Sequence, residues 1–217
     1  MLIKESEYLK ELICALPKEN LKILNFGSQS SKYLKKQPYI YENIINTVIK
    51  EGHTITNLDL QDVDGVDLVG DIFNDDFFLK LKELNFDVIF VFNILEHVTK
   101  LELMISRLQE LVKSGKYILF SGPYKYPFHM DPIDNMFRPD VNEVSNLFNK
   151  CVKISGKQLL DYPYSKYLFK SSFVFIKEVF RIVAFFYKFE KWKKVVLPKL
   201  KWIFTRFEVT CVLFKKL

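Results

Sequence analysis

The segment at residues 86–92, Phe-Asp-Val-Ile-Phe-Val-Phe, limits the fold most strongly, because six of its seven residues are apolar. An apolar run without alternation is typical of a parallel strand that is buried on both faces of a sheet. The residues that follow at 93–98, Asn-Ile-Leu-Glu-His-Val, indicate the start of a helix. Ligands bind at such junctions in open α/β sheets, at the carboxyl ends of the strands. The segment therefore predicts a central parallel strand that ends at a binding site.

Strand and helix patterns alternate along the first 120 residues, which predicts an α/β fold with a mostly parallel sheet and helices on both faces. The expected strands are residues 21–26, 54–58, 66–69, 86–92 and 116–120. The expected helices are residues 6–16, 41–51, 75–84 and 100–112, the last of them capped by Thr99.

The pattern changes after Ser121. Residues 122–139 contain four prolines among aromatic side chains, which predicts a long loop of the kind that often holds substrate. A helix at 140–149 and strands at 151–155 and 208–214 are expected to follow. We expect one domain over residues 1–217, with a core of about 21–155 plus 207–215 and a basic, aromatic, helical insertion at about 157–205.

The charge of the chain is divided unevenly. Residues 1–149 carry 16 Lys and Arg against 22 Asp and Glu, a net −6, whereas residues 150–217 carry 16 against 4, a net +12. This asymmetry indicates an anionic partner such as a membrane surface, a phosphate-bearing substrate or nucleic acid. A lysine-rich face in water explains the same charge equally well.

Within the insertion, residues 172–189 show helical spacing of apolar side chains, interrupted by charges, so we expect an amphipathic helix and no membrane span. Trp192 and Trp202 lie among lysines, which would suit peripheral contact with anionic lipid headgroups. Nucleic acid is a weaker expectation, because no recognition module accompanies the charge.

Cys14, Cys151 and Cys211 are widely spaced and form no CxxC pattern, so neither a disulfide framework nor a zinc site is expected, and we expect no metal. The first residues contain acidic side chains and no apolar core of signal-peptide length. We therefore expect a cytoplasmic protein, with peripheral contact at the inner membrane face as an extension.

Four strand ends carry residues that suit a nucleoside-type cofactor. Gly27 follows the first strand and permits a tight turn, Asp59 can accept from ribose hydroxyls, and Asp71 with Ile72 can edge the base. Asn93 ends the fourth strand, where it can contact cofactor or acceptor or simply form the turn. The turn at residues 25–31 has one glycine where a dinucleotide fingerprint has three, which disfavours a pyrophosphate-binding dehydrogenase.

At these residues the chain resembles the class I S-adenosylmethionine-dependent methyltransferases, over about residues 21–140. Residues 21–31 look like the first motif of that family, 55–59 like its ribose-binding strand end, and 86–98, with its Leu-Glu-His-Val ending, like its fourth-strand motif. The resemblance implies a Rossmann-like seven-stranded sheet whose last strand is antiparallel, and S-adenosylmethionine across the ends of strands one, two and four. It implies cofactor contacts from Asn25, Gly27, Ser28, Asp59, Asp71, Ile72 and Asn93. Asn25 stands where the family usually has an acidic residue, and residues 28–31 replace a Gly-rich turn.

Residues 123–139 are similar to a segment of small methyltransferases associated with bacterial surface-polysaccharide synthesis. This similarity puts His129, Asp131, Asp134 and Arg138 near the methyl acceptor. His129 could take a proton from a sugar hydroxyl, or it could hold the loop by hydrogen bonds. Asp131 and Asp134 could compete as bases, orient His129 or cap turns.

Glu96 and His97 are expected in the first turn of a helix, where a local structural role is favoured over a catalytic one. The resemblance implies an S-adenosylmethionine-dependent enzyme that methylates oxygen, on a sugar or related polar precursor of a cell-surface glycan that could be nucleotide- or lipid-linked. A decayed methyltransferase-like binding protein and a membrane-associated accessory subunit are the alternatives.

Overall fold

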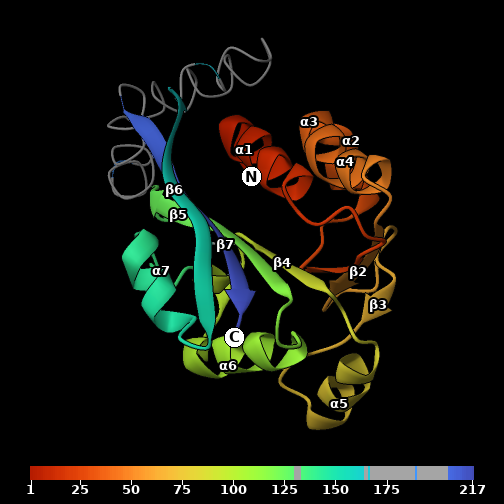
Figure 1. Cartoon of the computed structure of the whole chain (residues 1–217). Helices are drawn as coiled ribbons and strands as arrows, with labels where there is room; N and C mark the ends of the chain where they lie inside the picture. Colours follow the sequence, from red (N-terminus) through yellow and green to blue (C-terminus); the bar gives the residue numbers. More distant parts are fainter. Residues whose placement is uncertain (130–132, 164–165, 167–188, 190–204) are drawn as a thin grey trace.

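The computed structural model describes residues 1–129, 133–163, 166, 189 and 205–217, which include seven strands. The strands are β1 (Lys22–Phe26), β2 (Thr54–Asp59), β3 (Leu68–Val69), β4 (Val88–Phe92), β5 (Tyr117–Lys125), β6 (Cys151–Pro163) and β7 (Arg206–Lys216). They form one sheet in the order β3-β2-β1-β4-β5-β7-β6 (Figure 1).

The directions of the strands confirm the expected sheet. The neighbouring strands from β3 to β5 pair in parallel, and β7 pairs antiparallel with both β5 and β6. Strand β1 lies between β2 and β4. The chain therefore builds the sheet outward from β1 in one direction through β2 and β3, and in the other direction through β4 and β5. A crevice at the carboxyl ends of β1 and β4 is the usual consequence of such a reversal.

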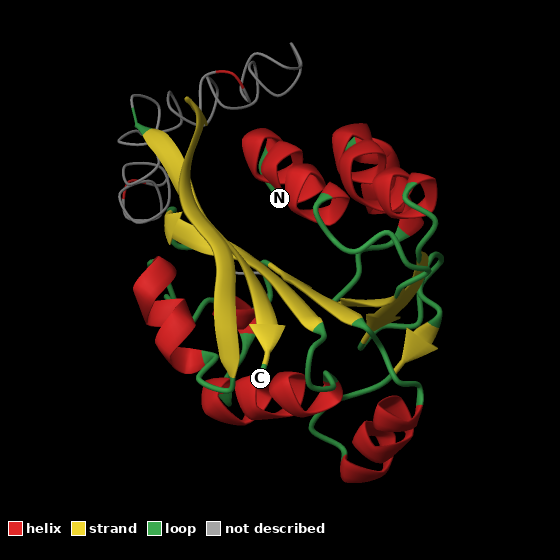
Figure 2. Cartoon of the chain, viewed as in Figure 1, coloured by secondary structure: helices red, strands yellow, loops and turns green. Residues whose placement is uncertain are grey.

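Helices cover both faces of the sheet (Figure 2). On one face lie α1 (Ile3–Cys14), α2 (Ser31–Lys36), α3 (Pro38–Ile40), the π-helical turn η1 (Tyr41–Ile45) and α4 (Asn46–Lys50). On the other face lie α5 (Asp75–Glu83), α6 (Leu101–Leu111) and α7 (Val141–Leu147).

Strand β4 is buried on both sides, as its apolar run predicts. Val88 and Phe90 pack in the cluster beneath α1 and α4, whereas Ile89 and Val91 pack in the cluster beneath α5 to α7. Successive side chains of a strand point to opposite faces, so four consecutive apolar residues contribute to two cores.

The junction after β4 differs from the expected helix start. A 3-10 turn, η2 (Leu95–His97), follows the strand, and α6 begins only at Leu101. The prediction that Thr99 caps this helix is wrong, since Lys100 stands at the cap position without a side-chain hydrogen bond. The side-chain amide of Asn135 donates to the carbonyls of Leu95 and Val98, so a distant loop fixes this turn.

The antiparallel part of the sheet is longer than the sequence pattern predicts. Strand β5 continues to Lys125, so the predicted loop at 122–139 is wrong for its first four residues. Pro123 is accommodated at a register irregularity against β7, where a ladder N–H is dispensable. Strand β6 runs to Pro163. Residues 157–163 therefore belong to this strand and not to the helical insertion expected at about 157–205.

The N-terminal helical region also differs in its extent. Helix α1 begins at Ile3, three residues before the expected start, and α2 was not predicted. The hydroxyl of Ser30 accepts from Tyr33 N and caps α2, which is a short-range signal. The predicted amphipathic helix at 172–189, apart from Phe189, lies outside the described residues, as do Trp192 and Trp202. Within the described part of the chain, the helices are too short or too polar to cross a membrane.

Candidate functional site

Two adjoining cavities lie at the carboxyl ends of β1, β4 and β5. The smaller, about 70 Å³, is lined by Asn25, Gly27 and Ser28, by Asn93, and by apolar residues of α3 and η1. The larger, about 310 Å³, extends toward β5 and the loop that follows it. The two cavities share the lining residues Met1, Gln29, Tyr33 and Asn93. The crevice expected from the strand order is therefore present.

The turn after β1 is built around Gly27, whose φ is +71°. The backbone N–H groups of Gly27 and Ser28 both donate to the carbonyl of Leu58 at 2.9 Å, which ties this turn to β2. A Cβ at Gly27 would lie 2.1 Å from Cδ1 of Ile94, so the turn is closely packed against the end of β4. A side chain is excluded here by both the backbone conformation and the space.

Ser28 is buried, and its hydroxyl has no hydrogen-bond partner among the described residues. A buried hydroxyl without a partner costs free energy, and such groups commonly mark a place where a ligand or water binds. Because Ser28 lines the smaller cavity beside Gly27, its hydroxyl suits a polar ligand atom at this turn.

The other predicted cofactor residues around β1 to β3 form hydrogen bonds within the protein or pack in the core. The side-chain amide of Asn25 donates to Oδ1 of Asn57 at 2.9 Å. The Oδ1 atom of Asp59 accepts from Gln61 N at 3.0 Å, and Oδ1 of Asp71 accepts from Phe73 N at 2.8 Å. Ile72 is buried in the core against α5 and α6. Asp59, Asp71 and Ile72 line neither cavity, whereas Asn25 lines the smaller one.

Asn93 joins the end of β4 to a residue that sequence reasoning missed. Its φ is +53°, and its side-chain amide donates to Oε1 of Glu5 at 2.7 Å. The hydroxyl of Ser121 donates to the same oxygen at 2.7 Å, and Leu2 N donates to Oε2 at 2.7 Å. Glu5 is fully buried and lines the larger cavity, so three donors hold a carboxylate at the centre of the site.

A signal for Glu5 exists in the sequence. Glu5 shares the buried face of α1 with Leu9, Leu12 and Ile13, at the spacing i, i+4, i+7 and i+8. A carboxylate in the middle of an apolar helical face requires buried donors, which is a recognisable indication of a polar site.

His129 and Asp134 lie in contact in the loop after β5. Nδ1 of His129 lies 3.2 Å from Oδ2 of Asp134 and 3.3 Å from the carbonyl of Pro127. Both neighbours accept hydrogen bonds, so the proton of the neutral ring lies on Nδ1 and Nε2 carries a lone pair. Burial lowers the pKa of His129. Asp131, the third predicted catalytic residue, lies outside the described residues.

Asp134 holds this loop through several hydrogen bonds. It accepts from His129 N at 2.9 Å, from Met136 N at 2.8 Å and from Nη2 of Arg138 at 2.6 Å. Burial raises the pKa of the Asp134 carboxyl, but these hydrogen bonds outweigh burial and hold the pKa below its usual value. Asp134 is thus an anion in contact with His129, the arrangement that an orienting role would require.

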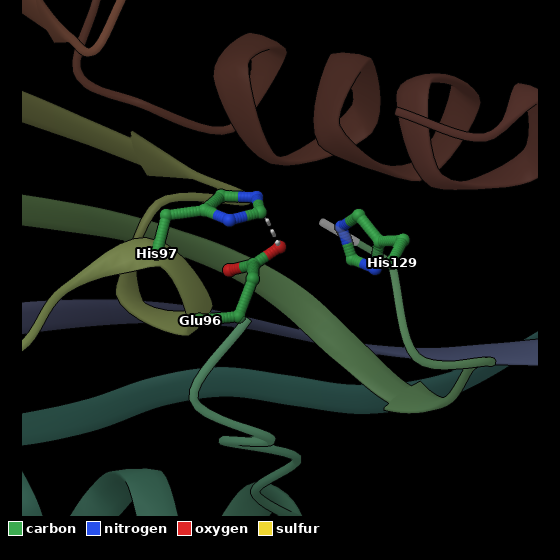
Figure 3. A group of neighbouring side chains, drawn as sticks. All are labelled: Glu96, His97 and His129. Atoms are coloured by element: carbon green, nitrogen blue, oxygen red, sulfur yellow. Dashed lines mark ion pairs between the residues drawn. The ribbon is translucent and has the colours of Figure 1, made fainter. Parts of the chain in front are cut away.

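Glu96 and His97 lie on the opposite wall of the larger cavity, in η2, and their side chains approach His129 (Figure 3). Oε1 of Glu96 lies 3.9 Å from Nε2 of His97, and the two imidazole rings are 5.1 Å apart between centroids. Burial raises the pKa of Glu96 to about 7. The sequence favours a local role for Glu96 and His97. It does not predict that their side chains approach His129, which is more than thirty positions away.

The fold is that of class I S-adenosylmethionine-dependent methyltransferases. No family model matches the sequence, and no curated protein matches it. Solved structures with the same fold include coclaurine N-methyltransferase, with a TM-score of 0.58, 14% identity, and coverage of 98% of this chain and 71% of that one.

A second similar structure is an S-adenosylmethionine-dependent methyltransferase from Archaeoglobus fulgidus, with a TM-score of 0.55, 15% identity, and coverage of 99% of this chain and 94% of that one. A third is the [4+2]-cyclase SpnF, with a TM-score of 0.56, 10% identity, and coverage of 97% and 80%. Since the same fold occurs in a cyclase, the fold alone does not define the reaction.

Proposed function

We propose that the protein is an S-adenosylmethionine-dependent methyltransferase that methylates an oxygen atom of a sugar or a related polar precursor of a cell-surface glycan. The observation that carries the proposal is the pair of adjoining cavities at the carboxyl ends of β1 and β4. One lies at a glycine turn, and the other is lined by titratable side chains. Solved methyltransferases with the same fold support the cofactor.

The residues at the turn fit this cofactor. Ser28 offers a buried hydroxyl that lacks a partner among the described residues, and Asp59 ends the neighbouring strand. Asn93 lies where the two cavities meet. A volume of about 70 Å³ corresponds to roughly two water molecules, so the cofactor would also enter the larger cavity. When bound, S-adenosylmethionine supplies an electrophilic methyl group on a sulfonium.

The larger cavity would align the acceptor. An acceptor hydroxyl there would form its oxygen–carbon bond as the carbon–sulfur bond breaks, and the hydroxyl proton would pass toward Nε2 of His129. Asp134 and the Pro127 carbonyl keep the ring in the tautomer that can accept it. Products are the methyl ether, S-adenosylhomocysteine and one proton.

The lining of the cavity supports a polar acceptor. Gln29, Gln37 and Glu5 line it together with Tyr33 and Tyr126, which offers hydrogen-bonding groups beside aromatic surfaces. Hydroxyl-rich ligands are recognised by such combinations. The resemblance of residues 123–139 to methyltransferases of polysaccharide synthesis supports the proposed acceptor class, whether free, nucleotide-linked or lipid-linked.

Cofactor binding is tested by titrating S-adenosylhomocysteine into the protein in a calorimeter. We expect saturable binding of one molecule per chain. Heat indistinguishable from dilution at millimolar ligand would refute the enzyme and favour the alternative of a decayed, methyltransferase-shaped binding protein.

The reaction is tested with S-adenosylmethionine that carries a labelled methyl group and with a panel of sugars, nucleotide sugars and small amines. We expect label on a hydroxyl-bearing acceptor and a decrease of about 100-fold or more in kcat for His129→Gln. Transfer to amines alone would show that the acceptor atom is nitrogen and not oxygen.

We further propose that residues 150–217 contact anionic lipid peripherally at the inner face of the membrane, because of their net charge of +12. Co-sedimentation with vesicles containing phosphatidylglycerol, but not with neutral vesicles, is the expected outcome, and added salt should weaken it. Equal sedimentation with both vesicle types would overturn this proposal.

A further inference from the structure

Three metal-ligating side chains converge in the larger cavity. Glu96, His97 and His129 each offer one ligand atom, and all three atoms lie within 4.8 Å of one another. Figure 3 shows Glu96 and His97 coming from the same turn while His129 approaches from the other side. Two imidazoles and one carboxylate are a common ligand set for divalent transition metals.

Contacts behind the ligand atoms match those of metal-binding histidines. Nδ1 of His97 hydrogen-bonds to the carbonyl of Ile133, so its ring proton lies on Nδ1 and Nε2 is free to coordinate. Nδ1 of His129 faces the Pro127 carbonyl and Asp134 in the same way. Histidine ligands usually donate their second ring N–H to a carbonyl or carboxylate, which fixes the ring and raises its basicity.

The ring orientations are also fixed by the surrounding loop. Asn135 N donates to the carbonyl of Glu96 at 2.8 Å, and the Asn135 side chain holds the carbonyls of Leu95 and Val98. The segment that positions His129 and the turn that carries Glu96 and His97 are therefore one connected unit. Such support is what a preorganised metal site requires.

We propose that Glu96, His97 and His129 bind a divalent transition-metal ion, with Zn²⁺ as the reference ion, through one carboxylate oxygen and the two Nε2 atoms. Bond lengths of about 2.0–2.2 Å around a tetrahedral ion separate its ligands by roughly 3.4 Å. The 3.9 Å between Glu96 and His97 therefore has to close by about half an ångström, and a pair at the 4.8 Å limit of the group by about 1.4 Å. The side chain of Glu96 is 3% exposed, and a cation would compensate its buried charge.

Three protein ligands would leave at least one coordination position open, and all three line the cavity that the acceptor would occupy. This part of the inference rests on the proposed methyl transfer. An acceptor hydroxyl on the ion would lose its proton to water more easily, because the positive charge stabilises the alkoxide. Nε2 of His129 would then coordinate the ion and could not accept the proton. Metal binding therefore determines whether this atom acts as a ligand or as a base.

Metal binding can be measured without the cofactor, which separates its failure from failure of the methyl transfer. The metal-free protein is titrated with Zn²⁺ in a calorimeter, and with Co²⁺ while its visible absorption is recorded. We expect one ion per chain and a Co²⁺ spectrum without a sulfur-to-metal charge-transfer band. A strong band of that kind would place the ion on cysteine and overturn the assignment.

Variants test the ligands individually. Glu96→Gln, His97→Gln and His129→Gln should each weaken Zn²⁺ binding by about 100-fold or more, beyond the 10–100-fold typical of residues behind the ligands. His53→Gln is the matched control, because His53 is the third histidine of the chain and lines neither cavity. Unchanged affinity in His97→Gln and His129→Gln would refute the site.

Imidazole NMR of the unmodified protein covers the case in which a variant fails to fold. With three histidines in the chain, we expect stoichiometric Zn²⁺ to shift the ring signals of two and to leave the third in place. Shifts of all three in proportion to metal concentration would indicate adventitious binding and overturn the proposal, as would no shift at all.

Discussion

The two sides of the crevice are built in different ways. On the side of β1 to β3, the carboxylates accept from residues two positions away, in the pairs Asp59–Gln61 and Asp71–Phe73. On the side of β4 and β5, Glu5 receives bonds from residues 88 and 116 positions away. The cavity on the first side is about 70 Å³ and that on the second about 310 Å³.

This difference separates binding from chemistry. The first side offers a tight turn and hydrogen-bonding groups at strand ends, which suits recognition of a cofactor. The second side gathers carboxylates and imidazoles, and burial raises the pKa of Glu96 and lowers that of His129, which suits proton transfer or metal binding. Changes on the two sides should therefore have separable effects.

The largest expected effect is on folding, through Glu5→Ala. Removing the carboxylate leaves buried donors on Leu2, Asn93 and Ser121 without an acceptor, so we expect the free energy of unfolding to fall by about 3 kcal/mol. Glu7→Ala, at an exposed position of the same helix, should change it by less than about 0.5 kcal/mol. Urea denaturation measures both variants, and equal losses would contradict the central role of Glu5.

The next effect is on the cofactor side, through Gly27→Ala. A Cβ there would lie 2.1 Å from Cδ1 of Ile94, so the turn and Ile94 have to shift, and affinity for S-adenosylhomocysteine should fall about 100-fold, or about 2.7 kcal/mol. Gly52→Ala is the matched control, because its φ is +78° but a Cβ meets nothing within 4 Å. Calorimetry should find normal affinity in that control. Equal weakening of binding in both variants would mean that backbone strain, and not the contact with Ile94, causes the loss.

A smaller effect on cofactor affinity is expected from the acidic residues Asp59 and Asp71, and it should differ between the two. Asp59→Ala should weaken S-adenosylhomocysteine binding about tenfold while folding is retained, because one charge-assisted hydrogen bond is lost. Asp71→Ala should change affinity less, since Asp71 is exposed whereas Asp59 is half-buried. Indifference of both variants would remove this edge of the sheet from the cofactor site.

The sequence predicts the parts that depend on local patterns. The unbroken apolar run at 88–92 predicts a doubly buried strand, and Gly27 predicts a turn that requires a positive φ. Both properties belong to a residue and its close neighbours, so they can be read without tertiary information. The seven-stranded sheet and its antiparallel last strand follow from the family resemblance and are confirmed.

The acceptor side depends on contacts that no local pattern contains. The break between η2 and α6 requires Asn135, which is about forty residues away, and the length of β5 requires its pairing with β7. Glu96 and His97 could not be linked to His129 from spacing, because the loop between β5 and α7 sets their distance. Prolines in that loop predicted irregular structure, but a bulge let β5 continue through Pro123.

The most direct test of the account is the crystal structure of the protein with S-adenosylhomocysteine. The account predicts the ligand beside Gly27 and Ser28, with its sulfur directed into the cavity lined by Glu96, His97 and His129. A ligand whose sulfur faces away from that cavity, or that binds elsewhere on the sheet, would contradict it.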